Sequence, residues 1–132
     1  MCARMTAPAR RVVVADDDAD IRALVTISAK RAGLEVVASV ADGEQAIAAI
    51  VDLRPDLAIL DVAMPGLTGL QVCSKVRQNA DTADIPVLLL SAAVDEAARA
   101  AGREAGATDY LAKPFSPRAL VTWLNTEFAV AE

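Results

Sequence analysis

Short apolar runs alternate with helical patterns along the whole chain. Five of these runs are strand candidates. The first and third are continuous in valine, leucine, isoleucine and alanine, which is typical of a strand buried on both faces of a sheet. The predicted strands are Val12–Ala15, Leu34–Val40, Leu57–Leu60, Ile85–Leu90 and Thr108–Ala112. In the segments that follow them, apolar residues recur at helical spacing. The predicted helices are Asp18–Ala32, Asp42–Leu53, Leu67–Gln78, Asp95–Ala105 and Ser116–Phe128.

Helix start signals support these boundaries. Asp18 precedes the first helix, and its side-chain oxygens can accept hydrogen bonds from the free amides of the first turn. Asp42 with Gln45 three positions later resembles a capping box. Ser116-Pro117 supplies a cap and a first helical position for the last helix. The pattern of helices therefore rests on local chemistry as well as on periodicity.

The strict alternation of strands and helices predicts an α/β fold. We expect a doubly wound (βα)5 flavodoxin-like domain, with a five-stranded parallel sheet, right-handed crossovers and helices on both faces. A common strand order for five units is 2-1-3-4-5, and ligands of such sheets bind at the carboxyl ends of the strands, where the order reverses between strands one and three. No linker or charge block divides the chain. One domain is predicted over residues 10–132, after a disordered tail at residues 1–9.

Composition excludes several classes of function. The net charge of -5 argues against a surface for nucleic acid or for an anionic membrane, because the phosphates would be repelled. The chain has 2 cysteines and no histidine, so neither a disulfide framework nor a Cys/His zinc cluster is expected. No run approaches the length of about 18 to 20 apolar residues that a membrane-spanning helix needs. These observations predict a soluble cytoplasmic protein.

Five polar residues stand where predicted strands end. Asp16 and Asp17 follow the first strand, Asp61 the third, Ser91 the fourth and Lys113 the fifth. Because the carboxyl ends of parallel strands share one edge of a sheet, we expect an acidic pocket with a hydroxyl and an ammonium beside it. Such a pocket suits Mg²⁺, which prefers hard oxygen ligands, and it suits a phosphoryl group whose oxygens a lysine can neutralise.

Each of these residues also has an ordinary structural explanation. Taken alone, Asp61 is a turn residue, Ser91 a strand-end hydroxyl bonded to nearby backbone, and Lys113 a solvated loop lysine. The adjacent carboxylates of Asp16 and Asp17 repel each other unless a cation or a lysine compensates them. The functional interpretation therefore depends on the five residues meeting in one place.

Five segments of the chain resemble, in order, the receiver domain of two-component response regulators. They are Val12–Asp18, Pro55–Asp61, Met64–Gly69, Pro86–Ala92 and Gly106–Phe115. The resemblance extends from about Arg11 to the last helix and implies the flavodoxin-like receiver fold. It also implies a role for each candidate residue. Asp61 matches the phosphoacceptor, Asp16, Asp17 and the backbone carbonyl of Ala63 the metal ligands, Ser91 and Tyr110 the switch residues, and Lys113 the phosphate-binding lysine.

The resemblance further implies cofactors and partners. The metal is Mg²⁺, for which Mn²⁺ could substitute, and no other cofactor is expected. The phosphoryl donor is a sensor histidine kinase or a histidine phosphotransfer protein, and the signal passes to a downstream protein target, without direct contact to nucleic acid or membrane. The chain is then not an enzyme but a signalling phosphoacceptor that assists its own phosphorylation and dephosphorylation. Because Ala63 and Ala93 cannot orient a water near the site, we hypothesise slow self-dephosphorylation.

Signal transmission is expected at the face made by the fourth helix, the fifth strand and the fifth helix. Phosphorylation of Asp61 would draw Ser91 inward and let Tyr110 rotate from an exposed toward a buried position. The fourth helix is predicted to be marginal, since Gly102 in its interior costs about 1 kcal/mol relative to alanine. Its inward stripe is the alanine set Ala97, Ala98, Ala101 and Ala105. Trp123, off the main stripe of the fifth helix, is either a contact on this face or a packed residue.

Two other classes of function stay open at this point. An Mg²⁺-dependent phosphohydrolase could use an aspartyl nucleophile in a similar setting, although Asp61 is followed by Val62-Ala63 and no insertion could form a cap over a substrate. A constitutive interaction module with an unused acidic site is the second alternative. The last helical pattern ends near Phe128 and the sequence stops at Glu132. We therefore expect a single-domain regulator, although a piece of a longer protein would look the same.

Overall fold

A computed structural model of the protein describes residues 10–93, 95–113 and 116–127. Within these residues, strands and helices alternate as predicted: β1 (Arg11–Ala15), α1 (Ala19–Arg31), β2 (Glu35–Val40), α2 (Gly43–Leu53), β3 (Leu57–Asp61), α3 (Gly69–Gln78), β4 (Val87–Ser91), α4 (Glu96–Ala105), β5 (Asp109–Ala112) and α5 (Pro117–Glu127). The strands form one parallel sheet in the order β2-β1-β3-β4-β5. The predicted fold class and strand order are confirmed. The predicted tail at residues 1–9 and the helix end at Phe128 lie outside the described residues.

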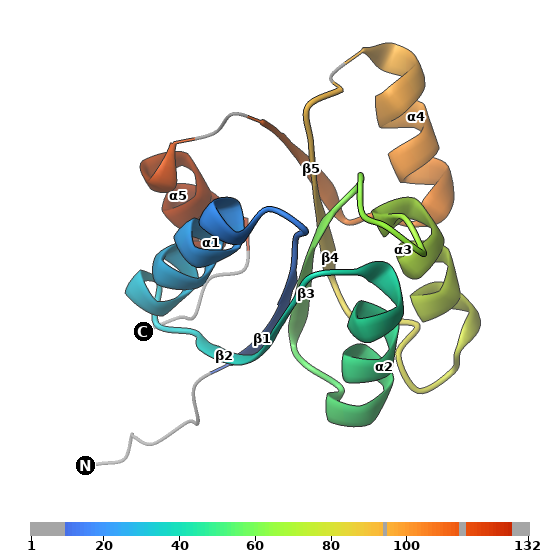
Figure 1. Ribbon diagram of the computed structural model, residues 1–132, viewed down its shortest axis with the longest axis horizontal. Coiled ribbons are helices and arrows are strands. Elements are labelled where there is room, and N and C mark those ends of the chain that lie inside the picture. Colours follow the sequence, from blue (N-terminus) through green and yellow to red (C-terminus); the bar gives the residue numbers. More distant parts are fainter. Residues whose placement is uncertain (1–9, 94, 114–115, 128–132) are drawn as a thin grey trace.

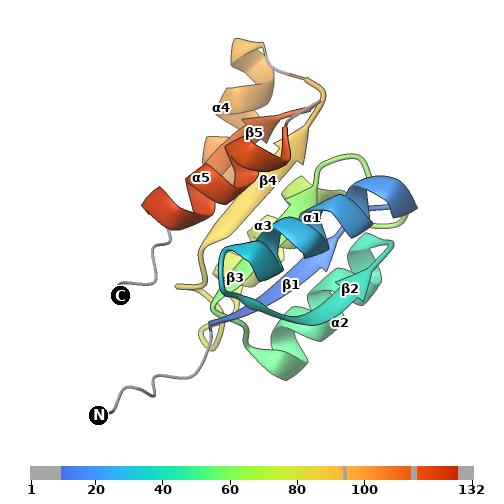
Figure 2. The same cartoon turned by 90° about the vertical axis from the view of Figure 1, so that its left-hand side faces the viewer.

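Helices cover both faces of the sheet. Helices α1 and α5 pack on one face, and α2, α3 and α4 lie on the other (Figures 1 and 2). The central strands β3 and β4 are buried over their whole length, and β1 is buried beyond Arg11. Side chains of a strand alternate between the faces, so Val12 and Val14 join the core under α1 and α5, whereas Val13 and Ala15 join the core under α2 and α3. This burial on both faces explains why the strands read as continuous apolar runs.

Aspartate and threonine side chains set the helix starts. Asp18 caps α1 and accepts hydrogen bonds from the amides of Asp20 and Ile21, as predicted. Asp42 caps α2 and accepts from the Gln45 amide at 2.8 Å. The full capping box lies at α3 instead and is a finding that the sequence pattern did not reveal. Its members are Thr68 and Gln71, whose side chains each accept a hydrogen bond from the backbone amide of the other, at 3.2 and 2.9 Å. This box starts α3 at Gly69 and not at the predicted Leu67.

A glycine brings the start of α3 against the end of β3. A Cβ atom added to Gly69 would lie 2.4 Å from the backbone oxygen of Asp61, which is closer than real Cβ contacts come. The Gly69 amide also donates to the Val62 carbonyl at 2.9 Å. The loop between β3 and α3 is therefore folded tightly around the last residue of β3.

Helix α4 differs in one respect from the predicted stripe. Ala98, Ala101 and Ala105 are half-buried as predicted, but Ala97 is exposed, and Gly102 is the buried position. The reason is the neighbouring strand, because the Tyr110 ring of β5 lies so close that a Cβ added to Gly102 would be 3.2 Å from Tyr110 Cδ2. Among the described helices, none has the length and hydrophobicity that crossing a bilayer requires.

Candidate functional site

Three carboxylates meet at the carboxyl ends of β1 and β3. Asp16 directly follows β1, Asp61 ends β3, and the two strands are neighbours in the sheet, with Ala15 paired to Leu60. One oxygen each from Asp16, Asp17 and Asp61 lies within 4.8 Å of the others. Asp16 and Asp61 are buried, whereas Asp17 is exposed. The predicted acidic pocket is thus present at the point where the strand order reverses.

Lys113 bridges two of these carboxylates. It directly follows β5, and its Nζ lies 3.0 Å from Asp16 Oδ2 and 3.1 Å from Asp61 Oδ1. Burial alone would lower the pKa of Lys113, but hydrogen bonds and charges from Asp16 and Asp61 outweigh it and raise that pKa above its ordinary value. The ammonium is therefore charged and held inside the pocket, and the interpretation of Lys113 as a solvated loop residue is wrong.

The surroundings of Asp61 disfavour the ionised form of its carboxylate. Burial raises the pKa of Asp61 to about 6, and the charge of Asp16 acts in the same direction. Lys113 opposes the shift, as does the amide of Ala63, which donates to Asp61 Oδ1 at 3.3 Å. The pocket consequently carries more negative charge than its single ammonium neutralises, so a bound cation would stabilise it.

The donor atoms of the pocket fit a hard divalent cation. The carboxylate oxygens are the ligand type that Mg²⁺ prefers, and their exposed member Asp17 leaves one side of the pocket open to water, which Mg²⁺ usually retains. Asp16 Oδ2 is buried and, among the described residues, has no partner besides the Lys113 ammonium. Ala63 lies in the loop after β3 and its backbone reaches Asp61, but a metal-binding role for its carbonyl stays a prediction.

Ser91 lies at the same edge of the sheet, at the end of β4. Its side chain is buried, and Oγ accepts a hydrogen bond from the Ala93 amide at 3.0 Å. This is the local bond expected of a strand-end hydroxyl. Asp61 pairs with Leu90 across the sheet, so Ser91 is one position further along than the phosphoacceptor candidate. The structure therefore brings Ser91 to the edge where Asp16, Asp61 and Lys113 meet.

Tyr110 is linked to Ser91 through Ala93. The Tyr110 hydroxyl donates to the Ala93 carbonyl, and the Ala93 amide donates to Ser91 Oγ. The ring is half-buried against the core under α2, α3 and α4, and the Arg99 guanidinium carbon lies 5.4 Å from its centroid. Gly102 leaves room for the ring beneath α4, so Tyr110 is partly exposed and partly packed, and its rotation on phosphorylation stays a prediction.

Sequence patterns missed two backbone contacts at the site. Ala93 was considered only as a side chain without polar atoms, yet its peptide groups connect Ser91 to Tyr110. Arg22 of α1 donates to the backbone carbonyl of Asp16 at 2.7 Å. Neither contact leaves a signal in the pattern of apolar and polar residues, because the acceptors are peptide groups that every residue carries.

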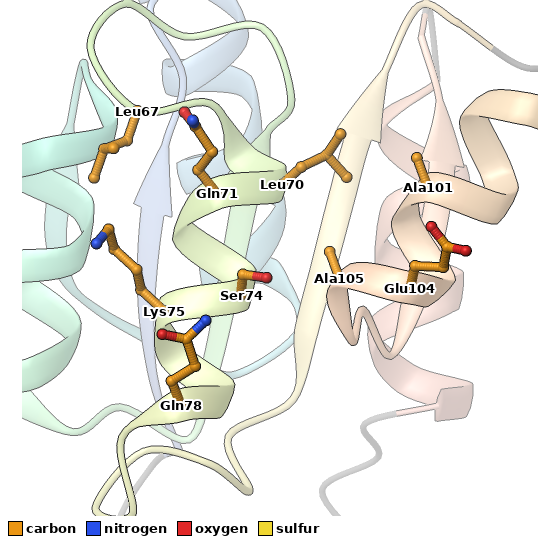
Figure 3. Close-up of a pocket in the computed structure, with 9 residues that line it drawn as sticks. All are labelled: Leu67, Leu70, Gln71, Ser74, Lys75, Gln78, Ala101, Glu104 and Ala105. Carbon is orange, nitrogen blue, oxygen red and sulfur yellow. The ribbon is translucent and has the colours of Figure 1, made fainter.

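Two hollows of the protein surface lie away from the carboxylates. A groove of about 570 Å³ runs between α3 and α4 and is lined by side chains such as Leu70, Ser74 and Ala105, as Figure 3 shows. A second hollow of about 520 Å³ lies beside α5 and includes Leu111 and Trp123. Trp123 is half-buried against the core, and its indole nitrogen donates to Asp109. Neither hollow contains a predicted site residue, so size alone does not locate the chemistry of this protein.

Comparisons with known proteins agree with this geometry. The sequence model of the response regulator receiver domain matches residues 12–125. The phosphate regulon transcriptional regulatory protein PhoB of Pseudomonas aeruginosa is 38% identical over 116 residues, which cover 88% of this chain and 50% of that protein. The DNA-binding response regulator MtrA of Mycobacterium tuberculosis (strain ATCC 25618 / H37Rv) is 40% identical over 112 residues, which cover 85% and 47%. The chain spans about half the length of these curated relatives.

Solved structures show the same fold. The chemotaxis response regulator CheY4 of Vibrio cholerae has a TM-score of 0.84 and 32% identity, with 93% of this chain and 100% of that chain covered. The receiver domain of the sensor histidine kinase PA1611 from Pseudomonas aeruginosa has a TM-score of 0.80 and 26% identity, with 88% and 96% covered. That receiver domain holds a magnesium ion in its active site cleft. On its sequence, its fold and its relatives, this chain belongs to the response regulator receiver domain family.

Proposed function

We propose that the chain takes up a phosphoryl group on Asp61 in an Mg²⁺-dependent step and thereby carries a signal in a two-component system or a phosphorelay. Receiver domains of response regulators are signalling proteins, and three carboxylates of this chain lie close enough together to hold a metal ion. The observation that carries the proposal is the Lys113 ammonium, which contacts both Asp16 and Asp61 in a cluster that Asp17 completes.

In the proposed step, an Asp61 carboxylate oxygen attacks the phosphorus of the donor. For a phosphohistidine donor, the new oxygen–phosphorus bond forms as the phosphorus–nitrogen bond breaks, and the imidazole leaves with the electron pair. Oδ1 of Asp61 is held by Lys113 and by the Ala63 amide, which orients the carboxylate for in-line transfer. Lys113 neutralises charge on the transferring oxygens, and Mg²⁺, when bound by Asp16, Asp17 and Asp61, would supply further positive charge there.

The protonation of Asp61 matters for this chemistry. A carboxylic acid is a poor nucleophile, and burial raises the pKa of Asp61 to about 6 in the protein without metal. At neutral pH the group is mainly ionised, and a bound cation would favour the ionised form further. We therefore expect phosphorylation to weaken below about pH 6, most strongly when Mg²⁺ is limiting.

The contacts of Ser91 support a route for the signal. Moving Ser91 Oγ toward a phosphoryl group on Asp61 would remove the acceptor of the Ala93 amide, and the Ala93 carbonyl is the acceptor of the Tyr110 hydroxyl. Tyr110 packs on α4, so a change at Asp61 would reach the face made by α4, β5 and α5. We propose that this face meets the downstream protein target. The size of the response depends on how differently the phosphoryl group contacts the two states.

Donor and lifetime follow as parts of the same proposal. The donor would be a sensor histidine kinase or a histidine phosphotransfer protein, in the cytoplasm, and the net charge of -5 argues against direct contact with nucleic acid or membrane. Ala63 and Ala93 are exposed and offer no side-chain group to orient a water. We therefore expect a long-lived phosphoprotein whose lifetime a partner phosphatase or kinase sets. Mn²⁺ would replace Mg²⁺, since it takes the same oxygen ligands.

Phosphorylation by a small donor tests the proposal. The protein is incubated with acetyl phosphate with Mg²⁺ or with EDTA, and intact mass and peptide mass spectrometry locate the label. We expect one phosphoryl group on Asp61 with Mg²⁺, none with EDTA, and none in Asp61→Asn. Asp52→Asn, at an exposed position of α2, is the matched control and should be labelled like the wild type. Steady donor turnover without an accumulated adduct would instead indicate a phosphohydrolase, and no reaction at all would indicate an interaction module.

A further inference from the structure

Arg22 of α1 reaches back to the loop that carries two of the three carboxylates. Its side chain is half-buried, and Nη1 donates to the backbone carbonyl of Asp16 at 2.7 Å. Resting on the proposed function, we infer that Arg22 is a positioning residue, which holds the peptide between Asp16 and Asp17 in the orientation that Mg²⁺ binding requires. It acts on the site through the backbone and not by touching the reacting atoms.

The surroundings of Asp16 show how complete this hold is. Its amide donates to the Val40 carbonyl at 3.1 Å, and its carbonyl accepts from Arg22. Its Oδ1 accepts from the Asp18 amide at 2.9 Å, and its Oδ2 pairs with Lys113 at 3.0 Å. Every polar atom of Asp16 therefore has a partner, and Arg22 is the one that reaches the peptide leading to Asp17.

Asp17 depends on the backbone for its position. Its side chain is exposed, and among the described residues it has no hydrogen bond or ion pair of its own. The carbonyl that Arg22 holds belongs to the peptide bond that joins Asp16 to Asp17. A rotation of this peptide would move the Asp17 carboxylate away from the other two. The bond from the Asp18 amide to Asp16 Oδ1 spans the peptide, and Arg22 is the side chain that holds its carbonyl directly.

Arg22 and Lys113 affect a bound cation in opposite ways. Lys113 occupies oxygens of Asp16 and Asp61 that could also bind the cation, and so competes with it. Arg22 donates to a carbonyl and leaves the carboxylate oxygens free. A simple charge argument predicts that removing the Arg22 guanidinium would tighten Mg²⁺ binding, because a positive charge is lost near the site. A positioning role predicts weaker binding, so the two explanations differ in sign.

The test measures Mg²⁺ binding directly, by isothermal titration calorimetry, in the wild type, Arg22→Gln, Arg22→Lys and Arg31→Gln. Arg31 is exposed in the last turn of the same helix and provides the same change of charge away from the site. Outer residues that orient metal ligands typically contribute about 10- to 100-fold to metal affinity. We expect at least about tenfold weaker binding for Arg22→Gln, a smaller loss for Arg22→Lys, and no change for Arg31→Gln.

Denaturant unfolding separates positioning from general destabilisation. A tenfold loss of affinity removes about 1.4 kcal/mol from the stabilisation that a saturating fixed Mg²⁺ concentration provides over EDTA. Equal destabilisation of Arg22→Gln in EDTA and in Mg²⁺, with unchanged affinity, would overturn the inference, as would tighter binding. If Arg22→Gln does not fold, Arg22→Lys decides by the same two measurements. Absence of Mg²⁺ binding in the wild type would contradict the proposed function itself, whereas a normal wild type with unaffected Arg22 variants would contradict only this inference.

Discussion

Ser28 is a buried polar residue without a visible function. It lies in the C-terminal half of α1 with a fully buried side chain, and its hydroxyl has no hydrogen-bond partner among the described residues. Replacing it by alanine removes an unsatisfied buried group at almost no change in volume. We expect Ser28→Ala to increase the free energy of unfolding by about 1 kcal/mol, measured by urea denaturation in EDTA.

Ser74 provides the control for this substitution. It lies in α3 and is half-buried beside the groove of Figure 3, so Ser74→Ala gains the same helix propensity without relieving a buried hydroxyl. The stability gain at Ser28 should exceed the gain at Ser74. Equal gains at the two positions, or a loss at Ser28, would mean that the Ser28 hydroxyl has a partner in solution.

At the scale of single residues, strand ends were the most informative positions of the sequence. Asp16, Asp61 and Lys113 were predicted to meet because each stands at the end of a predicted strand, and parallel strands direct their carboxyl ends to one edge. Arg22 was not predicted, since its acceptor is a peptide carbonyl that no residue type marks. Side chains that bind side chains are therefore easier to find from sequence than side chains that bind backbone.

At the scale of elements, the packing of α4 against β5 depends on a glycine, because Gly102 has no side chain to contact the Tyr110 ring. Gly102 faces Tyr110, and a Cβ at this position would lie 3.2 Å from Tyr110 Cδ2 and 3.5 Å from Leu89 Cδ1. Alanine gains about 1 kcal/mol over glycine in a helix interior, but here it must displace the ring. We expect Gly102→Ala to stabilise the protein by clearly less than that, and to change the protection of α4 amides from hydrogen exchange.

A double-mutant cycle isolates this steric contact. In a Tyr110→Ala background the ring is absent, and Gly102→Ala should then stabilise the protein by the full amount of about 1 kcal/mol. The difference between the two backgrounds measures the coupling of the helix to the ring. Additive effects would show that Tyr110 does not occupy the space beneath Gly102 in solution.

The Arg77 side chain of α3 connects the C-terminal end of α4 with the segment before β4. Its guanidinium donates to the carbonyls of Gly106 at 2.9 Å, Ala83 at 3.0 Å and Ile85 at 2.6 Å. Removing it would leave partly buried carbonyls without donors, at the turns before β4 and before β5. We expect Arg77→Gln to lower the free energy of unfolding by about 2–4 kcal/mol, measured by denaturant titration.

An exposed arginine of α4, Arg103, provides the control for Arg77→Gln. Arg103 pairs with Glu96 at 2.9 Å, and both side chains are largely exposed, at 63% and 80%. Pairs of this kind contribute little, so Arg103→Gln should change stability by less than about 1 kcal/mol. If the two arginine variants changed the free energy of unfolding by similar amounts, the backbone contacts of Arg77 would not stabilise the protein as proposed.

At the scale of the whole molecule, the sheet was predictable because its central strands are covered on both faces. The runs around Val14, Ile59 and Leu88 are continuous for this reason, and their alternation with helices leaves few possible topologies. The position of Tyr110 was not predictable, because it depends on Gly102, which appeared only as a weakness of its helix. Local patterns thus predict which elements form, whereas contacts between elements decide how a side chain such as Tyr110 packs.

Because of the same buried acidic site, we expect the stability of the whole protein to depend on pH and on Mg²⁺. The folded-state pKa of Asp61 is raised to about 6, mainly by burial, whereas the unfolded chain has the ordinary value near 3.8. Between these values the folded protein retains a proton that the unfolded chain has lost. The contribution of Asp61 to stability therefore falls as the pH rises from about 4 to about 6, and the charged group destabilises the metal-free protein at pH 7.

Asp61→Asn should consequently be more stable than the wild type in EDTA at pH 7, by about 1–3 kcal/mol, and the difference should vanish near pH 4. Urea denaturation at several pH values measures both quantities. Mg²⁺ favours the ionised carboxylate, so its addition should stabilise the wild type more than the variant and reduce or reverse the difference. A variant that is no more stable than the wild type in EDTA at pH 7 would contradict this prediction. It would show that Lys113 fully compensates the buried charge, so that the ionised carboxylate does not destabilise the metal-free protein.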